Sequence, residues 1–185
     1  MNRFVLLASG FGQALLIAAL IGGPICLLLR RMGRGRAAPL VLTCLFAVGL
    51  GHAPLPDPGA MDCLRGAEVH PVPFGQFAAE AAMAARTGGW AAFLTGLTFL
   101  STVLNVAMFA PAGAALRLLT GRRAAALALG LALPAVIESS QWTGIYGLYP
   151  CGWRTVDSTD VITNAAGVMI GFLAAARAGF GPRRD

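Results

Sequence analysis

The sequence predicts an all-α protein: a polytopic integral membrane helical bundle of about five transmembrane helices, with a long outer loop that contains a short interfacial helix. The chain is 57% hydrophobic and 12% charged, whereas soluble domains carry about 25% charged residues. All 14 basic residues are arginines clustered between apolar runs, a pattern typical of membrane orientation rather than nucleic-acid binding. The 185 residues are expected to form a single membrane domain, 1–185, with no separate soluble domain.

Five apolar segments account for the predicted spans, since a spanning helix needs about 20 mostly apolar residues. The segments that meet or approach this length are Phe4–Leu29, Ala37–Ala53, Trp90–Leu119, Ala124–Tyr149 and Val156–Ala178. The first resembles a secretory signal in hydropathy, but arginine-rich sequence follows it instead of a cleavage site. We therefore expect it to be retained as a helix.

The long outer loop, residues 54–89, divides into two halves. Several prolines interrupt helix in its first half, because proline lacks the backbone donor. The second half, 74–89, predicts a short helix whose apolar side includes Phe77 and whose polar side carries Glu80 and Arg86. Two roles stay open for this helix: resting on the bilayer surface, or forming a wall of a binding site.

The arginines predict the orientation. Ten of them fall in residues 30–36, residues 117–123 and the C-terminal end, which lie on one side of a five-span protein. The positive-inside rule places that side in the cytoplasm. Seven of the eight acidic residues fall in the opposite loops or the adjoining helix halves. We expect a multi-pass protein of the bacterial cell membrane with its N-terminus outside and its C-terminus in the cytoplasm.

The four cysteines separate into two kinds. Cys26 and Cys44 lie within apolar segments and are most simply packing residues. Cys63 and Cys151 both belong to predicted outer loops, where an oxidising exterior would allow a disulfide. Whether the two are paired or reduced stays open at this point. The absence of a CxxC motif gives no support for a structural zinc site.

The predicted fifth helix carries a stripe of polar and small residues. Asp157, Asp160, Asn164, Gly167 and Gly171 are spaced 3, 4, 3 and 4 residues apart, which places them along one helical face. Glycines allow close approach of a neighbouring helix. We therefore expect the polar half of the stripe to face a protected cavity instead of lipid.

Polar residues from two other helices and a loop are expected to join this stripe. Glu138 and Gln141 share a face of the fourth helix, and Asn105 interrupts the apolar third helix. A carboxylate at membrane depth costs about 2.5–3.5 kcal/mol, so it needs a partner. Arg154 is the nearest candidate in sequence, and arginine can clamp a carboxylate or a phosphate.

Two interpretations of this cluster stay open, and they can coexist. In one, it is a satisfied hydrogen-bond and ion-pair network that fixes helix packing. In the other, it is a ligand site that opens to the exterior or the outer leaflet, since ionisable groups within a membrane are candidates for function. The candidate ligand-binding residues are Asn105, Glu138, Gln141, Arg154, Asp157, Asp160 and Asn164.

The order of these residues resembles the VanZ-like membrane proteins over residues 45–175. The motifs that carry the resemblance are Val72-Pro73-Phe74, Asn105-x-x-x-Phe109-x-Pro111-x-Gly113, Glu138-x-x-Gln141 and Arg154-x-x-Asp157-x-x-Asp160-x-x-x-Asn164-x-x-Gly167-x-x-x-Gly171. The resemblance implies a small helical protein of the bacterial cell envelope. The namesake of the family is an accessory factor in glycopeptide-antibiotic resistance clusters, associated with low-level teicoplanin resistance.

The first functional hypothesis is a non-catalytic envelope protein that contributes to antibiotic resistance. Its outer-facing pocket would bind a lipid head group, a lipid-linked cell-wall precursor or an amphiphilic, glycopeptide-type antibiotic, without a metal or cofactor. Arg154 would hold a phosphate or carboxylate, while Asp157 and Asp160 would hold cations, hydroxyls or amines. Membrane lipids are the expected partners, and nucleic acid is not.

The alternative is a membrane enzyme acting on a lipid or lipid-linked substrate at the outer leaflet. Glu138 would be the general acid or base, and Asp157 and Asp160 could bind a divalent cation. The sequence contains no GxSxG or HExxH motif that would supply a nucleophile or a zinc site. A transporter is disfavoured, because five helices without repeat symmetry are few for alternating access.

Overall fold

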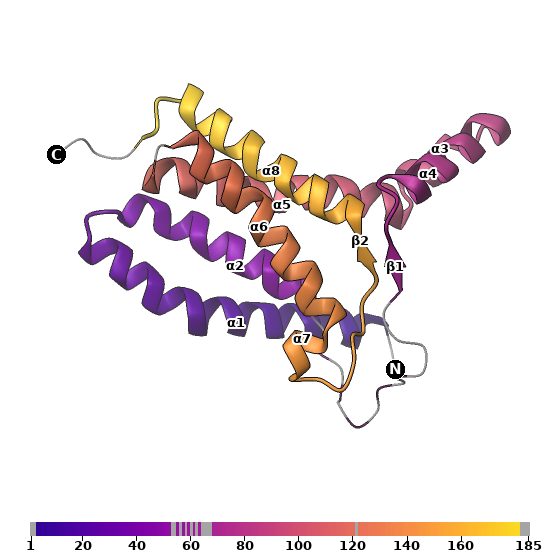
Figure 1. Cartoon of the computed structure of the whole chain (residues 1–185), viewed down its shortest axis with the longest axis horizontal. Helices are drawn as coiled ribbons and strands as arrows, with labels where there is room; N and C mark the ends of the chain where they lie inside the picture. Colours follow the sequence, from indigo (N-terminus) through magenta and orange to yellow (C-terminus); the bar gives the residue numbers. More distant parts are fainter. Residues whose placement is uncertain are drawn as a thin grey trace.

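The computed structural model describes residues 3–52, 55, 57, 59, 61, 63, 68–120 and 122–181. Its long helices are α1 (Arg3–Arg31), α2 (Ala38–His52), α5 (Leu97–Leu119), α6 (Arg123–Trp142) and α8 (Ser158–Arg177). The shorter elements are η1 (Gly35–Ala37), α3 (Gly75–Thr87), α4 (Trp90–Leu94), α7 (Gly144–Gly147), β1 (Val69–His70) and β2 (Val156–Asp157) (Figure 1). Outside the described residues lie Pro54, Pro56, Pro58, Arg65, Arg183 and Arg184.

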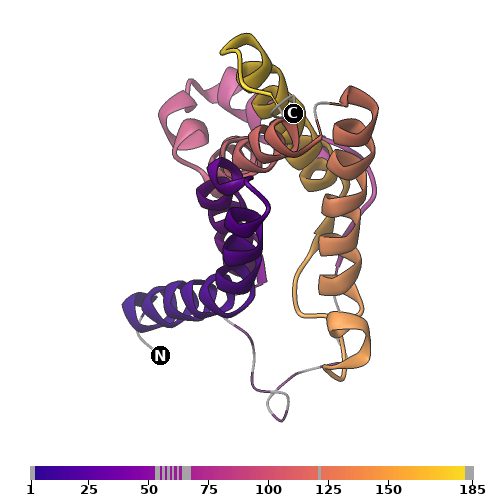
Figure 2. The ribbon, with the colours of Figure 1, turned by 90° about the vertical axis from the view of Figure 1, so that its left-hand side faces the viewer.

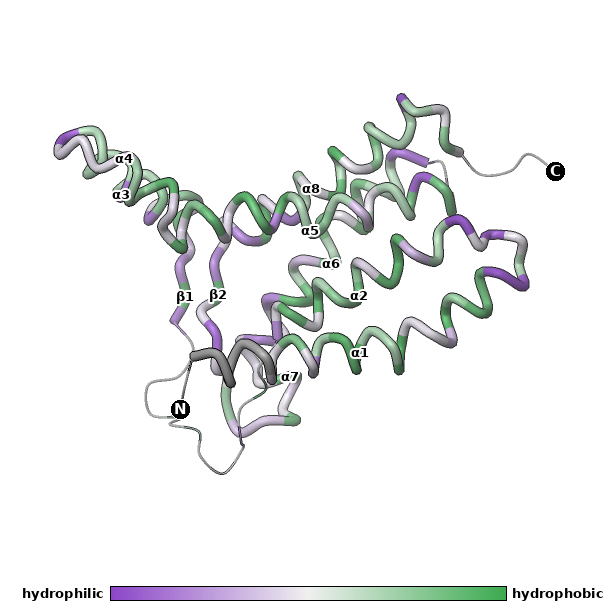
Figure 3. Tube along the Cα trace, turned by 180° about the vertical axis from the view of Figure 1, so that it is seen from behind, coloured by the Kyte–Doolittle hydropathy of each residue, from purple (hydrophilic) through white to green (hydrophobic). Residues whose placement is uncertain are grey.

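The predicted all-α membrane bundle is confirmed. Five stretches of the described chain are long and apolar enough to cross a membrane: Ser9–Arg31, Gly35–His52, Trp90–Leu119, Arg123–Trp142 and Ser158–Arg177. Apolar residues follow the long helices, while hydrophilic residues gather in β1, β2 and the α1–α2 turn (Figure 3). This distribution is the one expected where lipid surrounds a helical bundle.

Glycines interrupt two of the predicted spans, and the second of these is shorter than expected. The third is divided into α4 and α5 at Gly96, whose backbone is extended, with φ −71° and ψ 154°. The fourth ends at Trp142 instead of Tyr149, because Gly144 adopts a φ of +64° that a right-handed helix cannot continue. A Cβ at Gly144 would also collide with the carbonyl oxygens of Tyr149 and Cys151.

The bundle has two chemically different ends. The arginine end, defined by Arg30, Arg31, Arg117, Arg123 and Arg177, contains the α1–α2 and α5–α6 connections. The disulfide end, defined by the Cys63–Cys151 disulfide together with β1, β2 and α7, lies at the other end of the long helices (Figure 1).

Glycine contacts hold α5 and α8 together along their length. A Cβ on Gly167 or Gly171 of α8 would overlap the backbone of α5 at Val106 or Ala110. In the other direction, a Cβ on Gly113 of α5 would overlap the backbone of α8. The glycine half of the predicted stripe therefore allows the close helix approach expected of it.

The remaining long helices flank this pair on two sides. The pair α1 and α2 lies on one side and α6 on the other, with α5 and α8 connecting them (Figure 2). The core, at the centre of this arrangement, contains Phe109, Ile137, Val168 and Phe172, each at most 7% exposed. Between α2 and α6 the described contacts include two hydrogen bonds at the disulfide end, described below.

Two connections close the disulfide end. Cys63 and Cys151, 88 residues apart in sequence, form a disulfide. Beside it, β1 and β2 pair in parallel, and the Val156 amide donates to the Glu68 carbonyl at 2.9 Å. Together they hold the segment between α7 and α8 against the long loop. This segment contains Trp153 and Arg154.

The predicted short helix of the long loop corresponds to α3. With α4 it extends away from the bundle (Figure 1), and its Phe77 ring contacts the rings of Phe93 and Phe99. Its polar side is not wholly turned to solvent, because Glu80 accepts a hydrogen bond from the Thr98 hydroxyl at 2.7 Å. This contact connects α3 to the first turn of α5.

Replacing Gly171 by valine is expected to lower the free energy of unfolding by about 1–3 kcal/mol, because the side chain would force α5 and α8 apart. Chemical unfolding in detergent micelles measures the change. The matched control is Gly12→Val, since a Cβ at Gly12 meets no atom within 4 Å. Equal stabilities of the two variants would contradict the role assigned to the glycine contact.

Candidate functional site

A polar cavity of about 630 Å³ lies between α2, α5, α6, α8 and the segment that precedes β2. Six of the seven candidate ligand-binding residues line it: Asn105, Glu138, Gln141, Arg154, Asp160 and Asn164. They come from three helices and one loop, as the sequence predicted. The seventh, Asp157, lines a neighbouring cavity instead.

A side-chain hydrogen bond joins α5 and α8 at one wall of the cavity. Asn105 Nδ2 donates to Asp160 Oδ1 at 2.7 Å. The two residues meet because the glycines about two turns and more below them bring the helix backbones close together. Asn105 therefore supplies the partner that a carboxylate within the bundle requires.

Glu138 lies deeper and is 5% exposed. Its Oε2 accepts a hydrogen bond from the backbone amide of Asp157 at 3.3 Å. Arg154 lines the same cavity. The loop before β2 thus supplies Glu138 with a backbone donor and brings Arg154, the partner that its sequence position suggested, into the same cavity.

Hydrogen bonds between α2 and α6 close the cavity at the disulfide end. Gln141 Nε2 donates to the Gly51 carbonyl at 2.8 Å. His52 donates from Nδ1 to the Val48 carbonyl at 2.9 Å, and its Nε2 is 2.7 Å from the Ser140 hydroxyl. Gln141 and His52 therefore both have structural partners.

Two buried polar atoms of the described residues have no hydrogen-bond partner, and both belong to residues that line this cavity. They are Asn164 Oδ1 and Trp153 Nε1. Asn164 is 4% exposed. A buried acceptor or donor without a partner costs about 1–3 kcal/mol, and nearly all such groups in native proteins are satisfied. The cavity therefore offers one acceptor and one donor that a ligand can satisfy.

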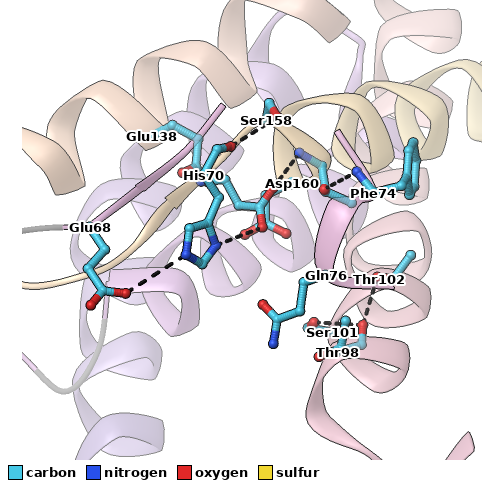
Figure 4. A network of polar contacts seen from close by, with 12 residues as sticks. Glu68, His70, Phe74, Gln76, Thr98, Ser101, Thr102, Glu138, Ser158 and Asp160 are labelled. Carbon is cyan, nitrogen blue, oxygen red and sulfur yellow. Dashed lines mark hydrogen bonds and ion pairs between the residues drawn. The ribbon is translucent and has the colours of Figure 1, made fainter. Parts of the chain in front are cut away.

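Asp157 has a different role from the one its spacing suggested. It is the N-cap of α8, where its Oδ1 accepts a hydrogen bond from the Thr159 amide at 2.7 Å. Its Oδ2 lies 3.4 Å from His70 Nδ1, and the other ring nitrogen of His70 is 3.8 Å from Glu68 (Figure 4). Asp157 therefore fixes the start of α8 and its contact with β1.

The neighbouring cavity, of about 440 Å³, lies on the α3 side of Asp160. It shares Ser101, Thr155 and Asp160 with the first cavity, so the Asn105–Asp160 hydrogen bond stands where the two meet. Gln76 and Phe77 of α3 line it, and Figure 4 shows Gln76 near Ser101 and Thr98. The binding-site-wall role left open for α3 therefore has a structural counterpart.

Some of the lining could not have been found from the sequence. Ala47, Val48 and Gly51 bring α2 into the cavity, but their side chains carry no polar atom that marks a site. Trp153 had a weak signal, since it directly precedes Arg154 in a turn-rich loop. Within the described ranges, no group of three or more His, Cys, Asp and Glu residues is arranged to hold a metal ion.

A model of the VanZ/LLP1 family matches residues 40–179. This range contains every residue described here that lines the two cavities. It also extends slightly beyond the residues 45–175 over which the motifs suggested a resemblance. Comparison with curated proteins and with solved structures found no match.

Replacing Asn105 by leucine is expected to destabilise the protein, because it leaves the Asp160 carboxylate without its partner. A hydrogen bond to a charged group contributes about 1.5–3 kcal/mol. A double-mutant cycle of Asn105→Leu and Asp160→Leu, measured by unfolding in detergent, should give a coupling energy in that range. Additive effects of the two substitutions would show that the hydrogen bond does not stabilise the α5–α8 contact.

Proposed function

The chain belongs to the VanZ/LLP1 family, and from this premise we propose that it is a cell-envelope protein that binds an amphiphile in the polar cavity. The ligand classes considered are a lipid head group, a lipid-linked cell-wall precursor and a glycopeptide-type antibiotic. Binding would alter how such molecules act at the membrane and so contribute to antibiotic resistance.

The observation that carries this proposal is the mixed lining of the cavity. Its polar part contains Glu138, Arg154 and Asp160. Its apolar part contains Val48, Met108, Phe109 and Ile137, which belong to or pack against the hydrophobic core. An amphiphile presents the same two surfaces, so a head group would meet the charges while a chain meets the core.

The orientation that we propose places the disulfide end outside the cell. Disulfides persist in oxidising compartments, and Cys63 and Cys151 are joined at this end. The arginine end carries the basic residues of four long helices, which favours the cytoplasmic side. With this orientation the cavity lies in the outer half of the membrane, within reach of outer-leaflet lipids.

The orientation predicts which introduced cysteines an impermeant maleimide can reach. Thr87 lies at the α3–α4 turn and Met32 lies at the arginine end, and both are exposed. In a background with Cys26 and Cys44 replaced by alanine, Thr87→Cys should be labelled in right-side-out vesicles. Met32→Cys should be labelled only after permeabilisation. The reverse pattern would place the cavity in the inner half of the membrane.

Binding predicts that Arg154→Ala removes the resistance that the protein confers. Loss of one charge-assisted contact of about 1.5–3 kcal/mol weakens binding by roughly ten- to hundredfold. The minimal inhibitory concentration of teicoplanin should therefore return to that of a host without the protein. Arg86→Ala is the matched control, because Arg86 is exposed on α3 and lines neither cavity. Full resistance in an inserted, well-expressed Arg154→Ala variant would overturn the proposal.

A further inference from the structure

The charge balance of the cavity favours a ligand with a positive group. Its ionisable lining contains two acidic residues, Glu138 and Asp160, and one basic residue, Arg154. Both carboxylates line the same cavity. Burying like charges together is unfavourable unless a cation lies between them. Arg154 is itself exposed, so the deeper part of the cavity is the more acidic.

The hydrogen-bond inventory specifies what kind of cation fits. Asn164 Oδ1 is a buried acceptor without a partner, one helical turn from Asp160 on the same face of α8. A primary ammonium group has three donors and no acceptor. Its three donors equal in number the three acceptor groups of this cavity, Asn164 Oδ1 and the two carboxylates. A quaternary ammonium carries the same charge but has no N–H to donate.

The loop that precedes β2 needs a ligand group that accepts hydrogen bonds. Trp153 Nε1 is a buried donor without a partner, and indole nitrogen only donates. Arg154 follows it directly and can donate to phosphate oxygens. A group with anionic oxygens would thus be held by this loop, next to the ammonium. The apolar wall of Val48, Met108 and Ile137 continues from there into the core.

Metal binding explains the presence of these two carboxylates in the cavity less well than an ammonium group does. Within the described ranges, no cluster of three or more side chains is arranged as a metal site. Each carboxylate is instead oriented by a separate donor: Asp160 by the Asn105 amide, and Glu138 by the Asp157 backbone. An organic cation with several N–H donors suits this arrangement better than an ion that needs converging oxygen ligands.

We infer that the cavity binds the head group of a zwitterionic amphiphile in which a primary ammonium, held by Glu138, Asp160 and Asn164, neighbours a phosphate held by Trp153 and Arg154. Phosphatidylethanolamine is the simplest membrane lipid with this chemistry. The inference rests on the proposed binding function and selects one ligand class from those considered there.

The experiment is a competition for the purified full chain in detergent, read by native mass spectrometry. The probes are equimolar phosphatidylethanolamine, phosphatidylcholine and phosphatidylglycerol with identical acyl chains. Retention of phosphatidylethanolamine should exceed that of each other lipid by about tenfold, the effect of one hydrogen bond to a charged group. Soluble phosphoethanolamine at the same concentration should displace it poorly, because it lacks the chains.

The variants separate the ammonium contacts from general lipid adhesion. Glu138→Gln and Asn164→Ala should each reduce the preference for phosphatidylethanolamine while leaving the other two lipids unaffected. Glu68→Gln is the matched control, since the Glu68 side chain is 78% exposed and lines neither cavity. Asn164→Ala also tests the inference if Glu138→Gln fails to fold.

Equal retention of phosphatidylethanolamine and phosphatidylcholine would overturn the inference, since it would show that no N–H donor is recognised. A preference for phosphatidylglycerol that depends on Arg154 would also overturn it, yet it would leave the proposed binding function intact. Retention of none of the three lipids would contradict both this inference and lipid binding. If phosphoethanolamine displaced the bound lipid as effectively as the whole lipid does, the acyl chains would contribute nothing to binding. The ligand would then not be recognised as an amphiphile, which would contradict the inference.

Discussion

The close contact between α5 and α8 is the constraint on which the rest of the site depends. Three glycines leave no room for side chains between the two backbones, so the polar residues above them meet at hydrogen-bond distance. A wider helix pair would separate Asn105 from Asp160. The inner wall of the cavity would then lose its shape, because Phe109 and Val168 pack in the same interface.

The polar residues above this contact differ in how completely they are satisfied. Gln141, His52 and Asp157 bond to backbone or to neighbouring side chains, and they hold α2, α6, α8 and β1 in register. Asn164 Oδ1 and Trp153 Nε1 are buried atoms without a hydrogen-bond partner. The two interpretations of the cluster therefore apply to different members of it. A fixed rim surrounds an interior that retains unmet hydrogen-bonding capacity.

Hydropathy and spacing predicted the number of long helices and the ionisable and amide residues of the cavity lining, because both depend on local composition. They did not predict the breaks at Gly96 and Gly144, since an average over about 20 residues does not register one backbone torsion. Asp157 matched the helical period, but the preference of aspartate for the N-cap placed it outside the helix. The part of α2 that lines the cavity is apolar, so no pattern marked it.

The disulfide has a consequence for biogenesis. Cys63 precedes α3, α4, α5 and α6 in the chain, whereas Cys151 follows them. The bond can therefore form only after those helices have been synthesised. Until then the Trp153–Arg154 segment lacks its covalent tether, so this wall of the cavity is fixed last. The covalent closure of the disulfide end therefore follows the synthesis of every helix that lies between the two cysteines.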